Sequence, residues 1–218
     1  MEKFRNSKLR FKLLLWDKHG PVFQWSDREK MILEALRFVR ANKINGDYFE
    51  FGVGEGYTLS SAMRIARALK MDMFFHGFDS FKGLPDTSEY PFTKGMYRFE
   101  EELVMRKLPS LHNIELHKVW FSELKNGRFR FNIPSIVWVD CDLYESTKPV
   151  LDWILPELQE GTIICFDDWN CFRGNPYKGE QRAFFEWQDD LNDAGWDYNP
   201  FLDFGWHGTS FIITRLKE

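Results

Sequence analysis

The chain has 218 residues, of which 44% are hydrophobic and 28% charged, and its formal net charge is −4. This composition is typical of an ordinary globular protein, and the lack of a basic surplus argues against nucleic acid as the main partner. The longest early apolar run, Leu13–Trp16, is too short for a signal peptide or a membrane span. Three cysteines without a C-x-x-C spacing argue against a zinc site. We therefore expect a cytoplasmic protein without membrane contact.

The N-terminal segment, residues 1–25, shows basic and aromatic residues without clear periodicity. We expect it to form an arm that packs on a partner subunit in a homodimer, and residues 26–218 to form a single domain. Ser26 and Glu29 have the spacing of a capping box, in which each side chain accepts a hydrogen bond from a backbone amide at a helix start. They predict a helix that ends before Asn45-Gly46.

The rest of the chain alternates between apolar runs and segments with helical periodicity. Strands are predicted at 48–51, 71–79, 114–119, 135–140 and 161–166, helices at 58–69, 97–108, 145–155 and 178–194, and two closing strands at 197–204 and 209–215. Such alternation predicts an α/β fold with a doubly wound, mostly parallel sheet. The closing pair makes it seven-stranded, with an antiparallel edge strand.

A glycine-rich turn, Glu50–Gly56, follows the first predicted strand. Its glycines Gly52, Gly54 and Gly56 do not fit G-x-G-x-x-G, the fingerprint of a dinucleotide site. Carboxylates in this turn would also repel a pyrophosphate. A ligand with cationic groups, such as S-adenosylmethionine, suits the turn better, and we expect Glu50 and the glycines to bind it.

Asp79 ends the next predicted strand, and a carboxylate there can accept hydrogen bonds from both hydroxyls of a ribose. The alternative is that the glycines form an ordinary tight turn and that Asp79 caps the following loop. The combination of strand, glycine turn, helix and acid favours adenosylmethionine.

Two acidic clusters end the predicted strands at 135–140 and 161–166. Adjacent parallel strands lie about 4.8 Å apart, so Asp140 can meet Asp167 and Asp168 at the carboxyl edge of the sheet. Carboxylates this close repel unless a cation neutralises them, and all-oxygen ligation favours Mg²⁺, Mn²⁺ or Ca²⁺, with Mg²⁺ preferred. Asp142 either caps the helix that follows, with Glu145, or takes part in catalysis.

Four segments resemble the macrocin O-methyltransferase family: Glu50–Val53, Phe78–Pro85, Val139–Thr147 and Phe166–Trp169. The resemblance runs from about Ser26 to Arg215. It implies a Rossmann-like class I methyltransferase domain that is metal-dependent and methylates hydroxyls of sugars or natural products.

By this resemblance Asp140, Asp167 and Asp168 match the metal ligands, and Asp142 matches a general base. His207, in the link between the two closing strands, is a second candidate for the base, although a lone histidine in a turn is more often a surface residue. The same likeness makes Asp79 the ribose-binding acid. It places Asp140, Ser80 and Trp120 beside the cofactor, although Val119-Trp120-Phe121 stands where the family usually has a glycine before the aromatic. The implied partner is a small hydroxylated acceptor.

Two other functions fit the same predicted fold. An NAD(P)-dependent oxidoreductase would need the missing third glycine and would leave the paired aspartates unexplained. A non-catalytic, methyltransferase-like interaction module would be expected to have lost acids from the rim, whereas all of them are present.

Overall fold

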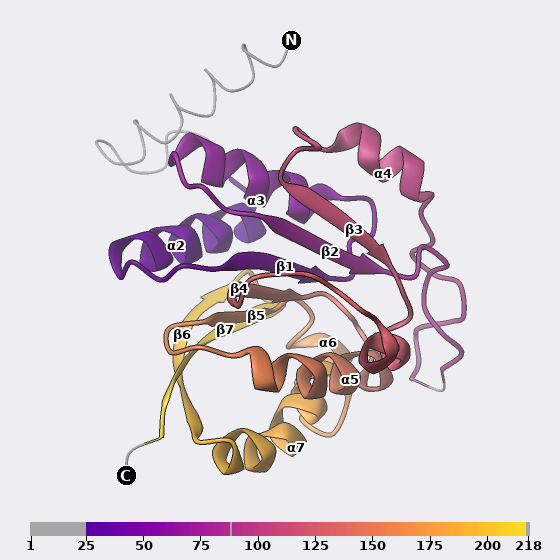
Figure 1. Cartoon of the computed structure of the whole chain (residues 1–218). Helices are drawn as coiled ribbons and strands as arrows, with labels where there is room; N and C mark the ends of the chain where they lie inside the picture. Colours follow the sequence, from indigo (N-terminus) through magenta and orange to yellow (C-terminus); the bar gives the residue numbers. More distant parts are fainter. Residues whose placement is uncertain (1–24, 88, 217–218) are drawn as a thin grey trace.

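The computed structural model describes residues 25–87 and 89–216, which build one twisted sheet between two layers of helices (Figure 1). The strand order is β3-β2-β1-β4-β5-β7-β6. All neighbours are parallel except that β7 runs antiparallel to β5 and β6. The strands are β1 (Asp47–Phe51), β2 (Phe75–Asp79), β3 (Ile114–Lys118), β4 (Pro134–Val139), β5 (Ile163–Phe166), β6 (Trp196–Phe204) and β7 (Gly208–Arg215). The predicted mostly parallel, doubly wound sheet is confirmed.

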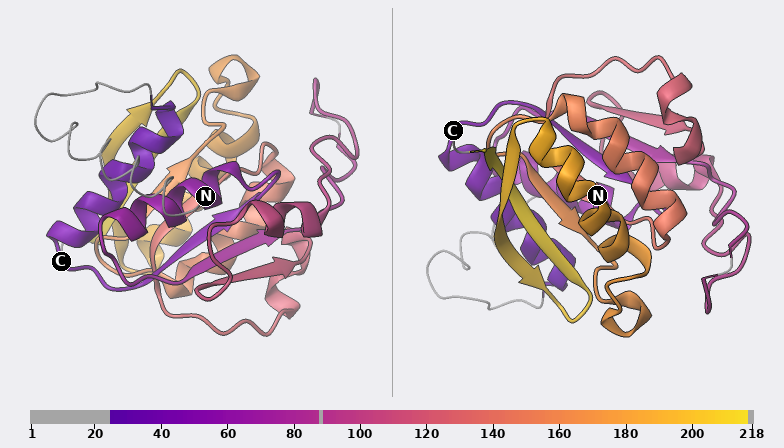
Figure 2. Two further views of the ribbon diagram at one scale, coloured as in Figure 1. Left: turned by 90° about the horizontal axis from the view of Figure 1, so that it is seen from above. Right: turned by 90° about the horizontal axis from the view of Figure 1, so that it is seen from below.

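Helices cover both faces of the sheet, as the two turned views show (Figure 2). One face carries α2 (Asp27–Ala41), α3 (Tyr57–Ala68) and α4 (Glu101–Lys107), and the other carries α5 (Tyr144–Ile154) and α7 (Gly179–Asp193). This coverage explains why every residue of β1 and β4 is buried and why most of them are apolar or aromatic. Three short elements complete the described chain: η1 (Phe121–Asn126), η2 (Leu155–Glu157) and α6 (Cys171–Gly174).

The capping box at the start of α2 is present as predicted. The Ser26 Oγ accepts a hydrogen bond from the Glu29 amide at 3.1 Å, and the Glu29 carboxylate accepts one from the Ser26 amide at 3.0 Å. This pair settles where α2 begins.

Two predicted elements are shorter than the sequence pattern suggested. β2 begins at Phe75 rather than Met71, because the pairing with β1 starts where Phe75 lies opposite Tyr48 and the Phe74 carbonyl accepts a hydrogen bond from the Tyr48 amide. α4 begins at Glu101 rather than residue 97, because Tyr97 has a left-handed backbone (φ +59°) that a right-handed helix cannot contain. Both differences arise from tertiary contacts or turns that periodicity does not report.

The strand order reverses between β1 and β4. α3 leaves β1 toward one face and α5 leaves β4 toward the other, so the carboxyl ends of these two strands flank a crevice. Open α/β sheets bind ligands at such a switch point. The glycine turn after β1 and the acids after β4 are therefore neighbours.

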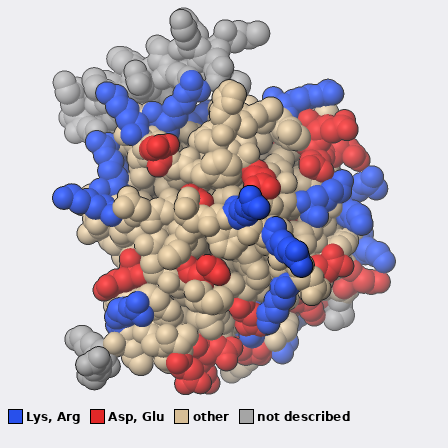
Figure 3. Space-filling view, viewed as in Figure 1, with Lys and Arg blue, Asp and Glu red and all other residues tan. Residues whose placement is uncertain are grey.

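The predicted arm falls on residues of which only Trp25 is described, and Trp25 is buried. The homodimer that the arm suggested stays a prediction, as does the cytoplasmic location. Among the described helices, none combines the length and apolarity that crossing a bilayer requires. On the face seen in Figure 3, lysines and arginines alternate with acidic residues rather than forming one basic area.

Candidate active site

A cleft of about 510 Å³ opens at the carboxyl ends of the central strands. Aromatic side chains, including Tyr97, Phe99 and Trp120, line one part of it, and acids line another. Of the residues predicted for the site, eight line this cleft: Gly52, Gly54, Asp79, Ser80, Trp120, Asp140, Asp142 and Asp168. Four others, Glu50, Gly56, Asp167 and His207, are not among the lining residues.

The glycine turn is required by the close approach of β1 and β4. Gly52 has φ +93°, and a Cβ atom built there would lie 1.8 Å from the carbonyl oxygen of Asp140. No other residue fits at this point, since any side chain would meet the neighbouring backbone. Gly56, with φ +81°, starts α3 without a side-chain cap. The turn thus leaves backbone, rather than side chains, facing the cleft beside Asp140.

Glu50, predicted to bind the cofactor, lies behind the turn and is fully buried. Its carboxylate accepts hydrogen bonds from the Tyr48 hydroxyl (2.8 Å) and the Leu59 amide (3.1 Å). Burial raises the pKa of Glu50 to about 8, although these hydrogen bonds oppose the rise. The structure therefore differs from the prediction: Glu50 holds the start of α3 against β1 and does not face the cleft, because a side chain on β1 points into the protein.

Asp79, the last residue of β2, lines the cleft. Its carboxylate accepts hydrogen bonds from the Gly54 amide at 3.0 Å and the Phe81 amide at 2.7 Å, one to each oxygen. Burial is the main reason that its pKa is raised, and these backbone donors oppose it. Because each carboxylate oxygen can accept a second hydrogen bond, Asp79 can both shape the glycine turn and receive two ligand hydroxyls.

Three carboxylates converge in the cleft and are called here the acidic cluster: Asp140, Asp142 and Asp168. One oxygen of each lies within 4.8 Å of the others. Asp140 directly follows β4, whereas Asp142 has a left-handed backbone (φ +58°) that turns the chain sharply before α5. Asp168 Oδ1 accepts a hydrogen bond from the Cys171 thiol, but its Oδ2 is buried without a hydrogen-bond partner.

The electrostatics of the acidic cluster are unfavourable without a cation. Burial, followed by the charge of Asp167, raises the pKa of Asp140 well above its usual range. Burial and the charge of Asp168 raise the pKa of Asp142 to about 8. Burial likewise raises the pKa of Asp168. Such a set of all-oxygen donors, with one oxygen lacking a partner, fits a hard divalent cation.

Asp167, predicted as a metal ligand, is placed differently. It is fully buried, and its carboxylate binds the guanidinium of Arg28 through Nε, at 2.8 and 3.0 Å, and through Nη2. Asp167 and Asp168 are adjacent in the turn after β5, but their carboxylates have different partners: Arg28 for Asp167 and the Cys171 thiol for Asp168. The structure thus brings Asp142, rather than Asp167, together with Asp140 and Asp168.

Arg28 was not predicted as a site residue. It lies in the capping box at the start of α2 and lines the cleft. One signal was available in the sequence: the positive end of a helix dipole disfavours a cation in the first turn, so an arginine there suggests a specific acidic partner.

His207, the second candidate for a base, lies outside the cleft. Its Nδ1 lies 2.7 Å from the backbone carbonyl oxygen of Asp167, and the residue faces a separate surface hollow beside the start of α2. The structure therefore favours Asp142 over His207 as the group next to a reacting hydroxyl.

Two glutamates connect the loops around the acidic cluster. Glu180 is buried in the first turn of α7, and its carboxylate accepts hydrogen bonds from the amides of Cys141 (3.2 Å) and Asp168 (2.9 Å). Glu89, in the long loop after β2, accepts hydrogen bonds from the first amides of α5 and α7, those of Tyr144 (3.0 Å) and Gly179 (3.3 Å). The ends of β4 and β5 and the loop over them are thus held together by carboxylates.

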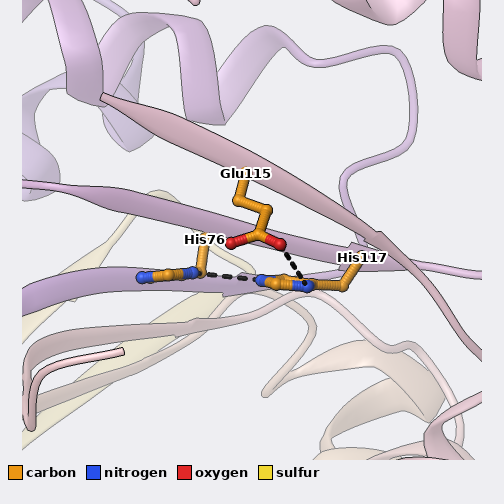
Figure 4. A group of neighbouring side chains, drawn as sticks. All are labelled: His76, Glu115 and His117. Atoms are coloured by element: carbon orange, nitrogen blue, oxygen red, sulfur yellow. Dashed lines mark hydrogen bonds and ion pairs between the residues drawn. The ribbon is translucent and has the colours of Figure 1, made fainter. Parts of the chain in front are cut away.

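A second group of titratable residues lies on β1, β2 and β3 and is called here the histidine chain: Asp47, His76, His117 and Glu115. Figure 4 shows His76, His117 and Glu115. His76 Nε2 lies 3.1 Å from Asp47 Oδ2, and His76 Nδ1 lies 3.0 Å from His117 Nε2. Glu115 approaches His117 Nδ1 only to 3.8 Å. Burial lowers the pKa of His76 and lowers that of His117 to about 4, so both rings are neutral at pH 7. None of the four lines the cleft.

Comparisons with known proteins identify a family. Residues 16–188 match the family model of macrocin-O-methyltransferase (TylF), and the match covers more than half of the chain. A curated relative is demethyldecarbamoylnovobiocin O-methyltransferase of Streptomyces niveus, which is 25% identical over 191 residues, 81% of this chain and 73% of the relative.

Solved structures show the same fold at lower identity. The O-methyltransferase NovP superposes with a TM-score of 0.72 at 22% identity, covering 87% of this chain and 80% of NovP. The calicheamicin methyltransferase CalS11 gives 0.63 at 20% identity, covering 97% and 91%. TomG of Streptomyces achromogenes, solved with adenosylmethionine, gives 0.55 at 14% identity and covers 100% of both chains. The family match and the class I methyltransferase fold together lead to one conclusion: the chain belongs to the macrocin O-methyltransferase family and is an S-adenosylmethionine-dependent O-methyltransferase.

Proposed function

We propose that this enzyme is dependent on a divalent cation, Mg²⁺ by preference, and methylates a hydroxyl of a sugar or natural-product-type small molecule. The observation that carries the proposal is the acidic cluster, whose Asp168 Oδ2 is buried without a partner, in the same cleft as the glycine turn and Asp79. The methyl donor and the acceptor hydroxyl can thus meet in one cavity.

Asp140 and Asp168 are the residues that would hold the cation. Mg²⁺ is commonly bound through one or two carboxylates and keeps its other positions for water or substrate oxygens. These two acids belong to both the predicted ligand set and the observed cluster. A bound cation would polarise an acceptor oxygen and lower the pKa of its hydroxyl.

Asp142 is the residue that we propose to receive the proton. Methyl transfer forms a bond between the acceptor oxygen and the methyl carbon, breaks the bond from that carbon to sulfur, and releases S-adenosylhomocysteine and one proton. A carboxylate held beside the acceptor oxygen can accept that proton as the new bond forms. Its position beside Asp140 and Asp168 places it next to the same acceptor oxygen.

The nucleoside end of the cofactor is proposed to lie on the other side of the cleft. Asp79 would accept hydrogen bonds from the ribose hydroxyls, and Trp120 and Phe121 line the cavity where the adenine can stack. Alignment of methyl and oxygen between these two ends would supply much of the rate, since well-oriented reactants gain roughly 7–11 kcal/mol over free encounter.

The known relatives support this acceptor class. The Streptomyces niveus relative is a demethyldecarbamoylnovobiocin O-methyltransferase, and CalS11 is described as a TDP-rhamnose 3′-O-methyltransferase of calicheamicin biosynthesis. The cleft volume of about 510 Å³ lies within the range of small-molecule sites. A hydroxylated small molecule is therefore the proposed acceptor.

The test combines calorimetry with a methyl-transfer assay. S-adenosylhomocysteine should bind the wild-type protein with or without Mg²⁺, and transfer of labelled methyl from adenosylmethionine to a panel of glycosides and phenolic natural products should stop on addition of EDTA. Asp142→Asn should lower kcat by at least 10²-fold with little change in S-adenosylhomocysteine binding. Asp189→Asn, an exposed change on α7, is the matched control and should leave both measurements unchanged.

Turnover that persists in EDTA would refute the cation, and full activity of Asp142→Asn would refute the proposed base. If S-adenosylhomocysteine binds normally but the methyl group is transferred to none of the hydroxylated compounds, or only to water, that result would refute only the acceptor class.

A further inference from the structure

The charge of the cleft is strongly one-sided. Five aspartates and two glutamates line it, and Arg28 is the only lysine or arginine among the described lining residues. S-adenosylmethionine carries two positive groups, the sulfonium and the ammonium, and one negative group, the carboxylate of its methionine part. The positive groups suit the acids, whereas the carboxylate needs a cationic partner.

We infer that Arg28 binds the carboxylate of the methionine part of adenosylmethionine and so fixes that end of the cofactor. The inference rests on the use of adenosylmethionine, and it is independent of the proposed cation and acceptor.

The guanidinium of Arg28 is already oriented for this task. The Asp167 carboxylate accepts hydrogen bonds from Nε and Nη2, and no described residue accepts one from Nη1. The Asp167 carboxylate is fully buried, whereas the arginine side chain is 38% exposed and reaches the cleft. Because the buried partner holds the planar group, little side-chain entropy remains to be lost when a second carboxylate binds at Nη1.

The position of Arg28 matches the methionine end rather than the nucleoside end. Along the sheet, Asp79 ends β2 and Asp167 follows β5, with β1 and β4 between them. Three strand spacings separate the two positions by on the order of 14 Å, the scale of an extended adenosylmethionine molecule. With the ribose at Asp79, the opposite end of the cofactor therefore reaches the side of the cleft where Arg28 lies.

The neighbouring helix starts support the same assignment. The Tyr57 hydroxyl donates a hydrogen bond to Ser26 Oγ at 3.0 Å, which places the first turn of α3 beside the first turn of α2. α3 begins without a side-chain cap and without an acid in its first turn. An anion at Arg28 would thus also lie near the positive end of the α3 dipole.

The experiment is calorimetry with two ligands that differ only in the carboxylate. S-adenosylhomocysteine carries it, and 5′-deoxy-5′-(3-aminopropylthio)adenosine does not. Charge-assisted hydrogen bonds of this kind correspond to about a 10- to 100-fold effect on affinity. Wild-type protein should prefer S-adenosylhomocysteine by that factor. Arg28→Gln should lose the preference, through weaker binding of S-adenosylhomocysteine alone.

Lys30→Gln is the matched control, because it removes a positive charge two positions further along α2, from a side chain that pairs with Asp27 and does not line the cleft. It should keep the wild-type preference. Since Arg28→Gln leaves Asp167 buried without its partner, the double variant Arg28→Gln/Asp167→Asn, which leaves no unpaired charge, is measured beside it after circular dichroism and thermal unfolding. It too should lose the preference.

Several outcomes would overturn the inference. Equal wild-type affinity for the two ligands would do so while leaving adenosylmethionine use intact, and so would a preference that survives in the folded double variant. If Arg28→Gln lowers the affinity for both ligands equally, Arg28 only supports the fold. An effect on KM for the acceptor alone would assign Arg28 to the acceptor instead. Failure of the wild-type protein to bind either ligand would refute the use of adenosylmethionine itself.

Discussion

The acidic cluster and the histidine chain contain similar numbers of titratable groups but are built in opposite ways. In the histidine chain, Asp47 accepts from His76 and from the Asn132 amide, and His76 pairs with His117, so the buried rings are neutral and hydrogen-bonded. In the acidic cluster, three carboxylates face one another and Asp168 Oδ2 has no partner. Buried polar groups without partners cost stability, and proteins retain them where a ligand completes them. The contrast supports our proposal that the acidic cluster is functional, and it indicates a structural role for the histidine chain.

The strongest way to test this contrast is to change Asp168. Asp168→Asn should lower kcat by about 10³-fold or more, because one of the two proposed cation-binding carboxylates is lost. The same change should not destabilise the protein in EDTA, since it removes a charge that raises the pKa of Asp142. Steady-state kinetics and urea unfolding check the two effects. A large loss of stability with little loss of kcat would reverse the assignment of the two groups.

The opposite result is expected for Asp47. Asp47→Ala removes the acceptor of His76 and of two Asn132 donors, so the free energy of unfolding should fall by about 3 kcal/mol, while kcat at 20 °C changes little. Glu115→Gln is the control, because its carboxylate is exposed and 3.8 Å from His117, and it should change stability by less than about 0.5 kcal/mol. If fully folded Asp47→Ala has a lower kcat than the wild type, the histidine chain contributes to function.

Divalent cation should stabilise the protein only through the acidic cluster. At a Mg²⁺ concentration about 100 times its dissociation constant, the free energy of unfolding should rise by about 2.7 kcal/mol. Urea unfolding with and without Mg²⁺ measures this rise. It should persist in Asp47→Ala and vanish in Asp168→Asn, and an equal rise in both variants would place the cation elsewhere.

At acidic pH the histidine chain should contribute less to the free energy of unfolding. The folded-state pKa of His117, about 4, lies below the unfolded value of 6.5, so the unfolded chain binds more protons in between. The contribution of His117 to the free energy of unfolding is present above pH 6.5 and falls by about 3 kcal/mol as the pH falls to 4. Wild-type stability minus that of His117→Gln, measured by urea unfolding, should therefore decrease over this range. A difference that stays constant would mean that His117 does not titrate as the structure indicates.

Much of the fold and part of the site could be predicted from local sequence. Strand and helix alternation, the capping box at Ser26 and the acids that end β4 and β5 are local features, and all of them appear in the structure. The direction of individual side chains was less predictable. Glu50 was expected in the cleft but lies behind it, and the buried bridge from Glu180 to two loops was not predicted.

The sequence by itself determined which residue types stand at the carboxyl ends of the strands, because periodicity and turn chemistry act over a few residues and survive without knowledge of the rest of the chain. Only the tertiary structure decided which of those carboxylates meet. Arg28 and Asp167 are 139 residues apart along the chain, and their ion pair separates Asp167 from Asp168, while the left-handed turn at Asp142 brings that acid into the cleft. Contacts of this kind depend on how α2 packs beside β5, which no local pattern encodes.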